Sequence, residues 1–114
     1  MKCISLMQPW ATLIAKGSKK IETRSWKTNY RGELYIHASQ RTDKKVLSKP
    51  SFSKALKDET IPNGVIIAKC KLVDCIKMDE AFVEKVKKQE YEYDFGEYKV
   101  GRYAWILELD FRRC

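Results

Sequence analysis

The hydrophobic positions near the start of the chain are spaced as they are in a helix. Trp10, Leu13 and Ile14 recur at i, i+3 and i+4, which places them on one buried helical face. Pro9 suits the first position of this helix, because a residue there needs no backbone N–H donor. Gly17 can end the helix, since glycine adopts a left-handed conformation without strain.

The next segment alternates between two sets of side chains, which is typical of a strand. If residues 19–26 form one strand, its two faces carry Lys20, Glu22, Arg24 and Trp26 on one side and Lys19, Ile21, Thr23 and Ser25 on the other. The first face combines an acid, two bases and an indole. Charged groups are rarely buried without partners, so this face is a candidate for function rather than for the core.

The remainder of the chain predicts more strands and a few short helices. Strands are expected over residues 2–7, 33–39, 65–76 and 102–111, and a helix capped by Asp79 is expected after the third of these. Residues 40–63 are irregular and rich in lysine, and we interpret them as a solvated insertion with short helices. Five short strands with irregularly placed helices predict an α+β fold, a small mixed β-barrel with helical insertions, in one domain over residues 1–114.

Charge is distributed unevenly along the 114 residues, whose formal net charge is +8. Residues 16–31 hold six cations and one acid, a local charge of +5, whereas residues 79–97 hold seven acids and three lysines, a local charge of −4. An excess of positive charge permits a polyanionic partner such as nucleic acid, although a solvated basic face would look the same. There is neither an apolar run of about 20 residues nor a signal peptide, so we expect a cytoplasmic protein without a membrane partner.

The cysteines and the histidine give little support for a metal site. The four cysteines form no CxxC pair, and His37 is the only histidine. Zinc sites in proteins usually draw on closely spaced cysteines and histidines. We therefore expect no metal and no cofactor, and we interpret His37 as a structural residue more readily than as a catalytic one.

Three segments together resemble a known family. They read QPWATLIAKGSKKIETRSW, YRGELYIHAS and GRYAWILEL, and they occur in the order found in ASCH domains. The most specific part is a G-x-K-x-x-E-x-R pattern formed by Gly17, Lys19, Glu22 and Arg24. The resemblance implies a small PUA-like barrel, a cleft lined by this helix–strand turn, and RNA or a modified nucleotide as the ligand.

The residue types in this pattern suit a nucleotide. Arg24 offers a planar fork for phosphate or a base edge, Lys19 supplies a point charge, and Glu22 can accept a hydrogen bond from an exocyclic amine. The expected ligand-binding residues of this basic cleft are Trp10, Lys19, Glu22, Arg24, Trp26 and Arg31. The competing interpretation assigns Glu22 and Arg24 to structural ion pairs and the tryptophans to the core, and for the tryptophans we favour the core.

Two other functions stay open. One branch of the family resembles an amidohydrolase that deacylates cytidine derivatives with a lysine, a threonine three residues later, and a distal glutamate. Lys19 matches the lysine, Glu22 stands in place of the threonine, and Glu90 loosely matches the distal glutamate, so these three would be catalytic if the protein were such an enzyme or a ribonuclease. The third function is a protein-interaction module in transcription or translation regulation, as larger ASCH-containing regulators suggest.

Overall fold

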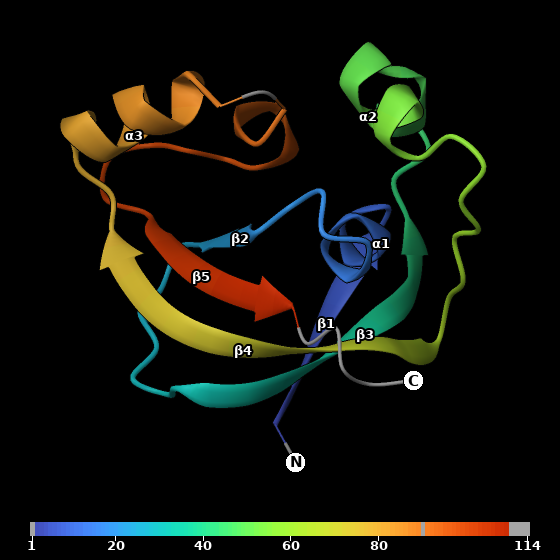
Figure 1. Ribbon diagram of the computed structural model, residues 1–114, viewed down its shortest axis with the longest axis horizontal. Helices are drawn as coiled ribbons and strands as arrows, with labels where there is room; N and C mark the ends of the chain where they lie inside the picture. The colour runs from blue at the N-terminus through green and yellow to red at the C-terminus, as the bar shows by residue number, and fades with distance from the viewer. Residues whose placement is uncertain (1, 90, 110–114) are drawn as a thin grey trace.

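The sheet has five strands in the order β1-β3-β4-β5-β2. The structure is a computed structural model, and it describes residues 2–89 and 91–109. The strands are β1 (Cys3–Gln8), β2 (Ile21–Arg24), β3 (Gly32–Thr42), β4 (Val65–Lys77) and β5 (Tyr103–Leu109). β1 pairs with β3 in parallel, and the other neighbours pair antiparallel. The sheet curls into a half-barrel (Figure 1), so the expected α+β fold with a small PUA-like barrel and helical insertions is confirmed.

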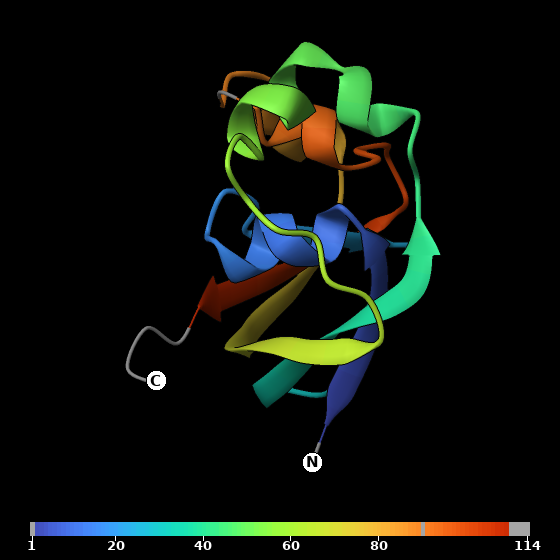
Figure 2. The ribbon, with the colours of Figure 1, turned by 90° about the vertical axis from the view of Figure 1, so that its right-hand side faces the viewer.

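The helices lie on the concave side of the sheet and at one end of it. They are α1 (Trp10–Ala15), η1 (Val46–Ser48), α2 (Pro50–Ala55), α3 (Glu80–Lys87) and η2 (Tyr93–Phe95). Figure 2 shows α1 inside the curl, with α2 and the α3–η2 segment together above it. In the described part of the chain, no helix combines the length and the apolar composition that crossing a membrane requires.

Local signals in the sequence set several of these boundaries. Gly17 follows α1 with φ = +86°, which a residue with a side chain rarely adopts, so the predicted helix end is confirmed. The carboxylate of Asp79 accepts a hydrogen bond of 2.8 Å from the backbone N–H of Phe82, as expected of a helix cap. The strand expected over residues 19–26 is shorter than predicted, because only Ile21–Arg24 pairs with β5.

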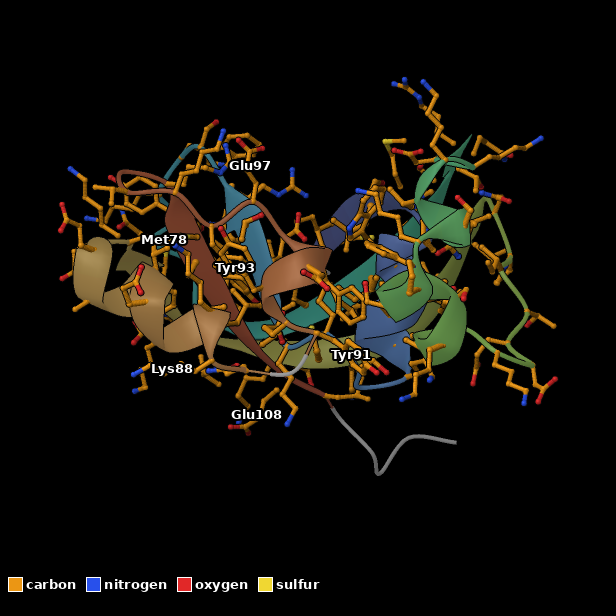
Figure 3. All side chains as sticks on the ribbon, turned by 90° about the horizontal axis from the view of Figure 1, so that it is seen from above. Met78, Lys88, Tyr91, Tyr93, Glu97 and Glu108 are labelled. Carbon is orange, nitrogen blue, oxygen red and sulfur yellow. The ribbon has the colours of Figure 1, made fainter. Side chains whose placement is uncertain are left out.

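One cluster of buried side chains joins α1, α2 and η2. Leu13, Phe52 and Phe95 are at most 1% exposed. The rings of Phe52 and Phe95 meet edge to face with their centroids 5.0 Å apart, and Figure 3 shows α2 beside η2. Burying each such side chain contributes about 1.5–3 kcal/mol. This cluster therefore holds segments that are distant in sequence in fixed positions around the inside of the curl.

Candidate functional site

A cavity of about 610 Å³ opens between the two edge strands of the half-barrel. Its lining includes residues 5–7 of β1 and residues 22–26 in and after β2, together with parts of the η1–α2 segment and of η2. Five of the residues singled out from the sequence line it, namely Trp10, Lys19, Glu22, Arg24 and Trp26. α1, the turn after it, and β2 with the residues that follow it thus bring the candidate side chains to one concave surface.

Glu22 and Arg24 form an ion pair in the wall of this cavity. Arg24 Nε lies 3.0 Å from Glu22 Oε2, and the side chains are 19% and 13% exposed, respectively. The contact lacks hydrogen-bond alignment, because Arg24 Nε is buried without a hydrogen-bond partner among the described residues. Burial raises the pKa of Glu22 above its usual value, and the nearby cations Lys19, Arg24 and Arg102 oppose that shift. The pair therefore presents a guanidinium and a partly desolvated carboxyl group.

The two tryptophans differ in their surroundings. Trp26 is 53% exposed, so the prediction that it belongs to the core is wrong. Arg24 Cζ lies 5.1 Å from the centroid of the Trp26 ring, and Trp105 meets that ring edge to face at 6.4 Å. Trp10 is half-buried and packs edge to face on Phe52 with a centroid separation of 5.9 Å. An exposed indole at the cavity wall is a surface on which a base can stack.

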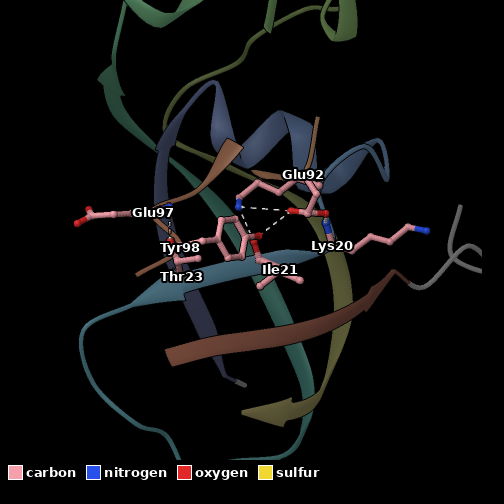
Figure 4. Close-up of polar contacts among 7 residues, drawn as sticks. Lys20, Ile21, Thr23, Glu92, Glu97 and Tyr98 are labelled. Atoms are coloured by element: carbon pink, nitrogen blue, oxygen red, sulfur yellow. Dashed lines mark hydrogen bonds and ion pairs between the residues drawn. The ribbon is translucent and has the colours of Figure 1, made fainter. Parts of the chain in front are cut away.

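Lys19 is buried at the cavity wall. Its side chain is 1% exposed, and Nζ donates to the backbone carbonyl of Ile21 and lies 3.9 Å from Glu92 Oε2 (Figure 4). Burial lowers the pKa of Lys19, while the negative charges of Glu22 and Glu92 oppose that shift. In this arrangement the ammonium group is held by the protein's own acceptors.

Glu92 is a site residue that the sequence reasoning missed. It is 6% exposed, Oε1 accepts a 2.9 Å hydrogen bond from the backbone N–H of Lys20, and Oε2 accepts one of 3.0 Å from the hydroxyl of Tyr98 (Figure 4). Burial, followed by the charge of Glu92, raises the pKa of Tyr98. Glu92 stands in a stretch in which aromatic and acidic residues alternate, so no sequence signal separates it from the other acids there. Glu90, the residue singled out instead, lies outside the described residues.

Arg31 and His37 do not line the cavity. Arg31 donates to the backbone carbonyls of Thr28 and Tyr30 at 3.1 and 2.9 Å, and lies 3.6 Å from a carboxylate oxygen of Asp74. His37 Nδ1 lies 2.9 Å from Oγ of Ser5, in keeping with a hydrogen-bonding role. Within residues 2–89 and 91–109, three or more histidine, cysteine or acidic side chains nowhere gather as they would around a metal ion.

The charge of the cavity lining is nearly balanced. The charged lining residues are the cations Lys19, Arg24, Lys49 and Arg102 and the acids Glu22, Asp94 and Glu97. Four positive charges against three negative charges leave an excess of one, and Lys19 and Arg24 already have acidic partners. The charge of the lining is therefore mixed rather than strongly basic.

Comparison with known proteins gives a family for the chain. The model of the ASCH domain family matches residues 4–109. Activating signal cointegrator 1 from Mus musculus is 35% identical to the chain over 86 residues, and its counterpart from Homo sapiens is 30% identical over 86 residues. Each match covers 68% of this chain, and the chain spans about 15% of the length of these relatives.

Proposed function

Because this chain belongs to the ASCH domain family, a PUA-like family associated with RNA binding, we propose that it binds RNA or a modified nucleotide with one nucleobase in the cavity between β1 and β2. The observation that carries the proposal is that Glu22, Arg24 and the exposed Trp26 line the same cavity of about 610 Å³. Pockets of about 300–1,000 Å³ are typical for small ligands, and a nucleoside falls within that class.

Each of these side chains has a chemical role in the proposed complex. A carboxylate oxygen of Glu22 accepts from an exocyclic amine of the base, and the guanidinium of Arg24 donates to a phosphate or a base edge. The indole of Trp26 stacks on the base, a contact worth about 1–3 kcal/mol.

The test is calorimetric titration with nucleosides, nucleotides, acylated cytidine and short RNAs, comparing the parent with Trp26→Ala. Loss of a stacking contact of about 1–3 kcal/mol weakens binding about 5- to 150-fold. Tyr93→Ala is the matched control, since Tyr93 is also an exposed aromatic residue (36%) but does not line the cavity. Equal affinities for the parent and Trp26→Ala would rule out the stacking role, and a parent that binds no member of the panel would end the proposal.

A second candidate function is hydrolysis of a nucleoside derivative or of RNA. It is favoured by two ionisable groups at the cavity wall whose pKa values shift in opposite directions, lowered for Lys19 and raised for Glu22. For proton transfer, Lys19 would have to leave the carbonyl of Ile21 and the carboxylate of Glu92. Incubation with acylated cytidines and short RNAs tests it: turnover that Lys19→Met abolishes supports an enzyme, and no product across the panel excludes these substrates.

Three further expectations stay predictions. They are the role of Arg31 as a ligand contact, the single-domain organisation over residues 1–114, and the cytoplasmic location. A protein-interaction role in transcription or translation regulation also stays a prediction.

A further inference from the structure

We propose that the ligand is a single-stranded nucleic acid rather than a free nucleotide, and that its backbone phosphates lie along a basic segment beside the cavity. The segment, called the basic rim below, consists of Arg41 near the end of β3 and of Lys44, Lys45 and Lys49 between β3 and α2. The inference rests on the proposed function, because one base of the strand occupies the cavity and its flanking phosphates contact the rim.

The charge distribution is the first argument. The cavity lining carries an excess of only one positive charge, although the chain as a whole carries +8. Residues 41–49 hold four cations against the single acid Asp43, a local charge of +3. A carboxylate oxygen of Asp43 already accepts a 3.0 Å hydrogen bond from the backbone N–H of Lys45. The rim therefore concentrates positive charge next to a cavity whose lining has little net positive charge.

The exposure of the rim is the second argument. All four of its cations are exposed, and among the described residues none lies within 4.0 Å of a carboxylate. Some other surface lysines have acidic partners, for example Lys87, 3.1 Å from Glu84, whereas the scattered residues Lys77 and Lys88 have none within 4.0 Å among the described residues; what distinguishes the rim is that four such cations lie within nine residues. The protein itself thus does not neutralise the charge of the rim, so these cations can neutralise phosphates and release the counterions condensed on a nucleic acid.

The position of the rim is the third argument. Val46, within the segment, is buried and lines the cavity, and Lys49 lines the cavity as well. Val46 packs in the same cluster as Phe52 of α2 and Phe95 of η2, and the segment is therefore anchored to the cavity wall by its core contacts. The interpretation of residues 40–63 as a mere solvated insertion does not explain why this part of it forms a wall of the cavity.

These observations together favour a single-stranded nucleic acid over a free nucleotide as the ligand. A base can enter the cavity only when it is unstacked and unpaired, which is the state of bases in single-stranded loops and ends. A free nucleotide brings phosphate to one point, whereas a strand places phosphates on both sides of the bound base. Each phosphate contact in a single strand contributes about 0.7 to the slope of log affinity against log salt.

The experiment measures binding of labelled RNA and DNA strands of about ten nucleotides, a length within the usual range of single-strand sites. Fluorescence anisotropy is recorded between about 0.05 and 0.2 M salt for the parent and the double variant Lys44→Gln/Lys45→Gln. Binding of a nucleoside monophosphate is measured in parallel. The control, Lys77→Gln/Lys88→Gln, removes the same charge from exposed residues that do not line the cavity, and Figure 3 shows Lys88, the residue after α3, well apart from α2.

The rim variant is expected to lower the salt slope for the strand by about 1.4, from two contacts of about 0.7 each. If the two proteins bind equally at about 1 M salt, this difference corresponds to about 25-fold weaker binding at about 0.1 M. Affinity for the monophosphate is expected to stay unchanged in both variants, and the control is expected to bind the strand as the parent does. Weakened binding of either the RNA or the DNA strand supports the proposal and identifies the preferred polymer.

Other outcomes separate this inference from the function beneath it. If the nucleic-acid strand binds the rim variant with the salt slope of the parent, the role of the rim is refuted, even if Trp26→Ala still weakens binding. Equal affinity of the parent for the monophosphate and for the nucleic-acid strand also refutes the inference. If the parent binds neither ligand, both the proposed function and the role of the rim are refuted. Lys44 and Lys45 are exposed, so thermal unfolding of the rim variant should match the parent.

Discussion

The buried pair Lys19–Glu92 allows a quantitative test of how the candidate site is held together. Glu92→Gln keeps the shape of the side chain. Its amide oxygen can still accept from the backbone N–H of Lys20, and its NH2 group, in the place of the second oxygen, can donate to the hydroxyl of Tyr98. What it removes is the negative charge 3.9 Å from the ammonium of Lys19. The ammonium then remains buried with the carbonyl of Ile21 as its hydrogen-bond acceptor.

The expected cost follows from the distance and the burial. Two unit charges 3.9 Å apart attract by about 4 kcal/mol at an effective dielectric constant of about 20. Removing one partner of a buried pair typically destabilises a protein by about 3–5 kcal/mol. The nearby charge of Glu22 still favours the ammonium, so we expect the lower end, about 3 kcal/mol. That is a large share of the roughly 5–15 kcal/mol that stabilises a domain.

The free energy of unfolding is measured by urea titration with circular dichroism, which suits a small domain. In the Lys19→Met background the same Glu92→Gln change should cost at least about 2 kcal/mol less, because no buried ammonium is left unpaired. Glu84→Gln, which breaks the exposed pair with Lys87 at 3.1 Å, is the control and should leave the free energy of unfolding nearly unchanged, because solvent screens an exposed pair. If the changes in unfolding free energy caused by Lys19→Met and by Glu92→Gln add to within about 0.5 kcal/mol in the double variant, the two side chains do not interact as proposed.

Three further predictions concern packing, thiol reactivity and pH. Gly96→Ala would place a Cβ 2.8 Å from Cε2 of Tyr98, so a loss of about 1–3 kcal/mol in unfolding free energy is expected, and an unchanged urea midpoint would contradict it. Alkylation at about pH 8 should modify the exposed Cys3 before Cys70, whose pKa burial raises to about 11; equal rates by peptide mass spectrometry would argue against this. Because the folded-state pKa of Glu22 is raised above 4.5, its contribution to stability is largest below 4.5 and is lost as pH rises through the folded value. Acidification should therefore raise the unfolding free energy of the parent relative to that of Glu22→Gln. A difference between the two proteins that does not change with pH would contradict this prediction.

Features that depend on neighbours in the chain could be predicted from the sequence. The spacing of Trp10, Leu13 and Ile14 indicated α1, and Gly17 marked its end because glycine tolerates φ = +86°. Asp79 was recognisable as a cap because a cap acts on an N–H only a few residues away. These signals are local, so the chain carries them whatever the rest of the fold does.

The site could be predicted only in part. The G-x-K-x-x-E-x-R pattern pointed to Lys19, Glu22 and Arg24, and all three line one cavity. The assumption of one strand over residues 19–26 was wrong, because pairing with β5 covers only Ile21–Arg24. Lys19 therefore lies outside the alternation and turns towards Glu92, and Trp26 lies beyond the paired residues and is exposed.

By itself, the sequence determined the order of strands and helices, the end of α1, the start of α3, and the family, since periodicity, capping and motif spacing are properties of consecutive residues. Only the tertiary structure decided that Glu92 would neutralise Lys19 and that Val46 and Lys49 would form a wall of the cavity. Ion pairing and side-chain packing depend on distances in space, and the curl of the sheet brings these groups together from segments far apart in the chain.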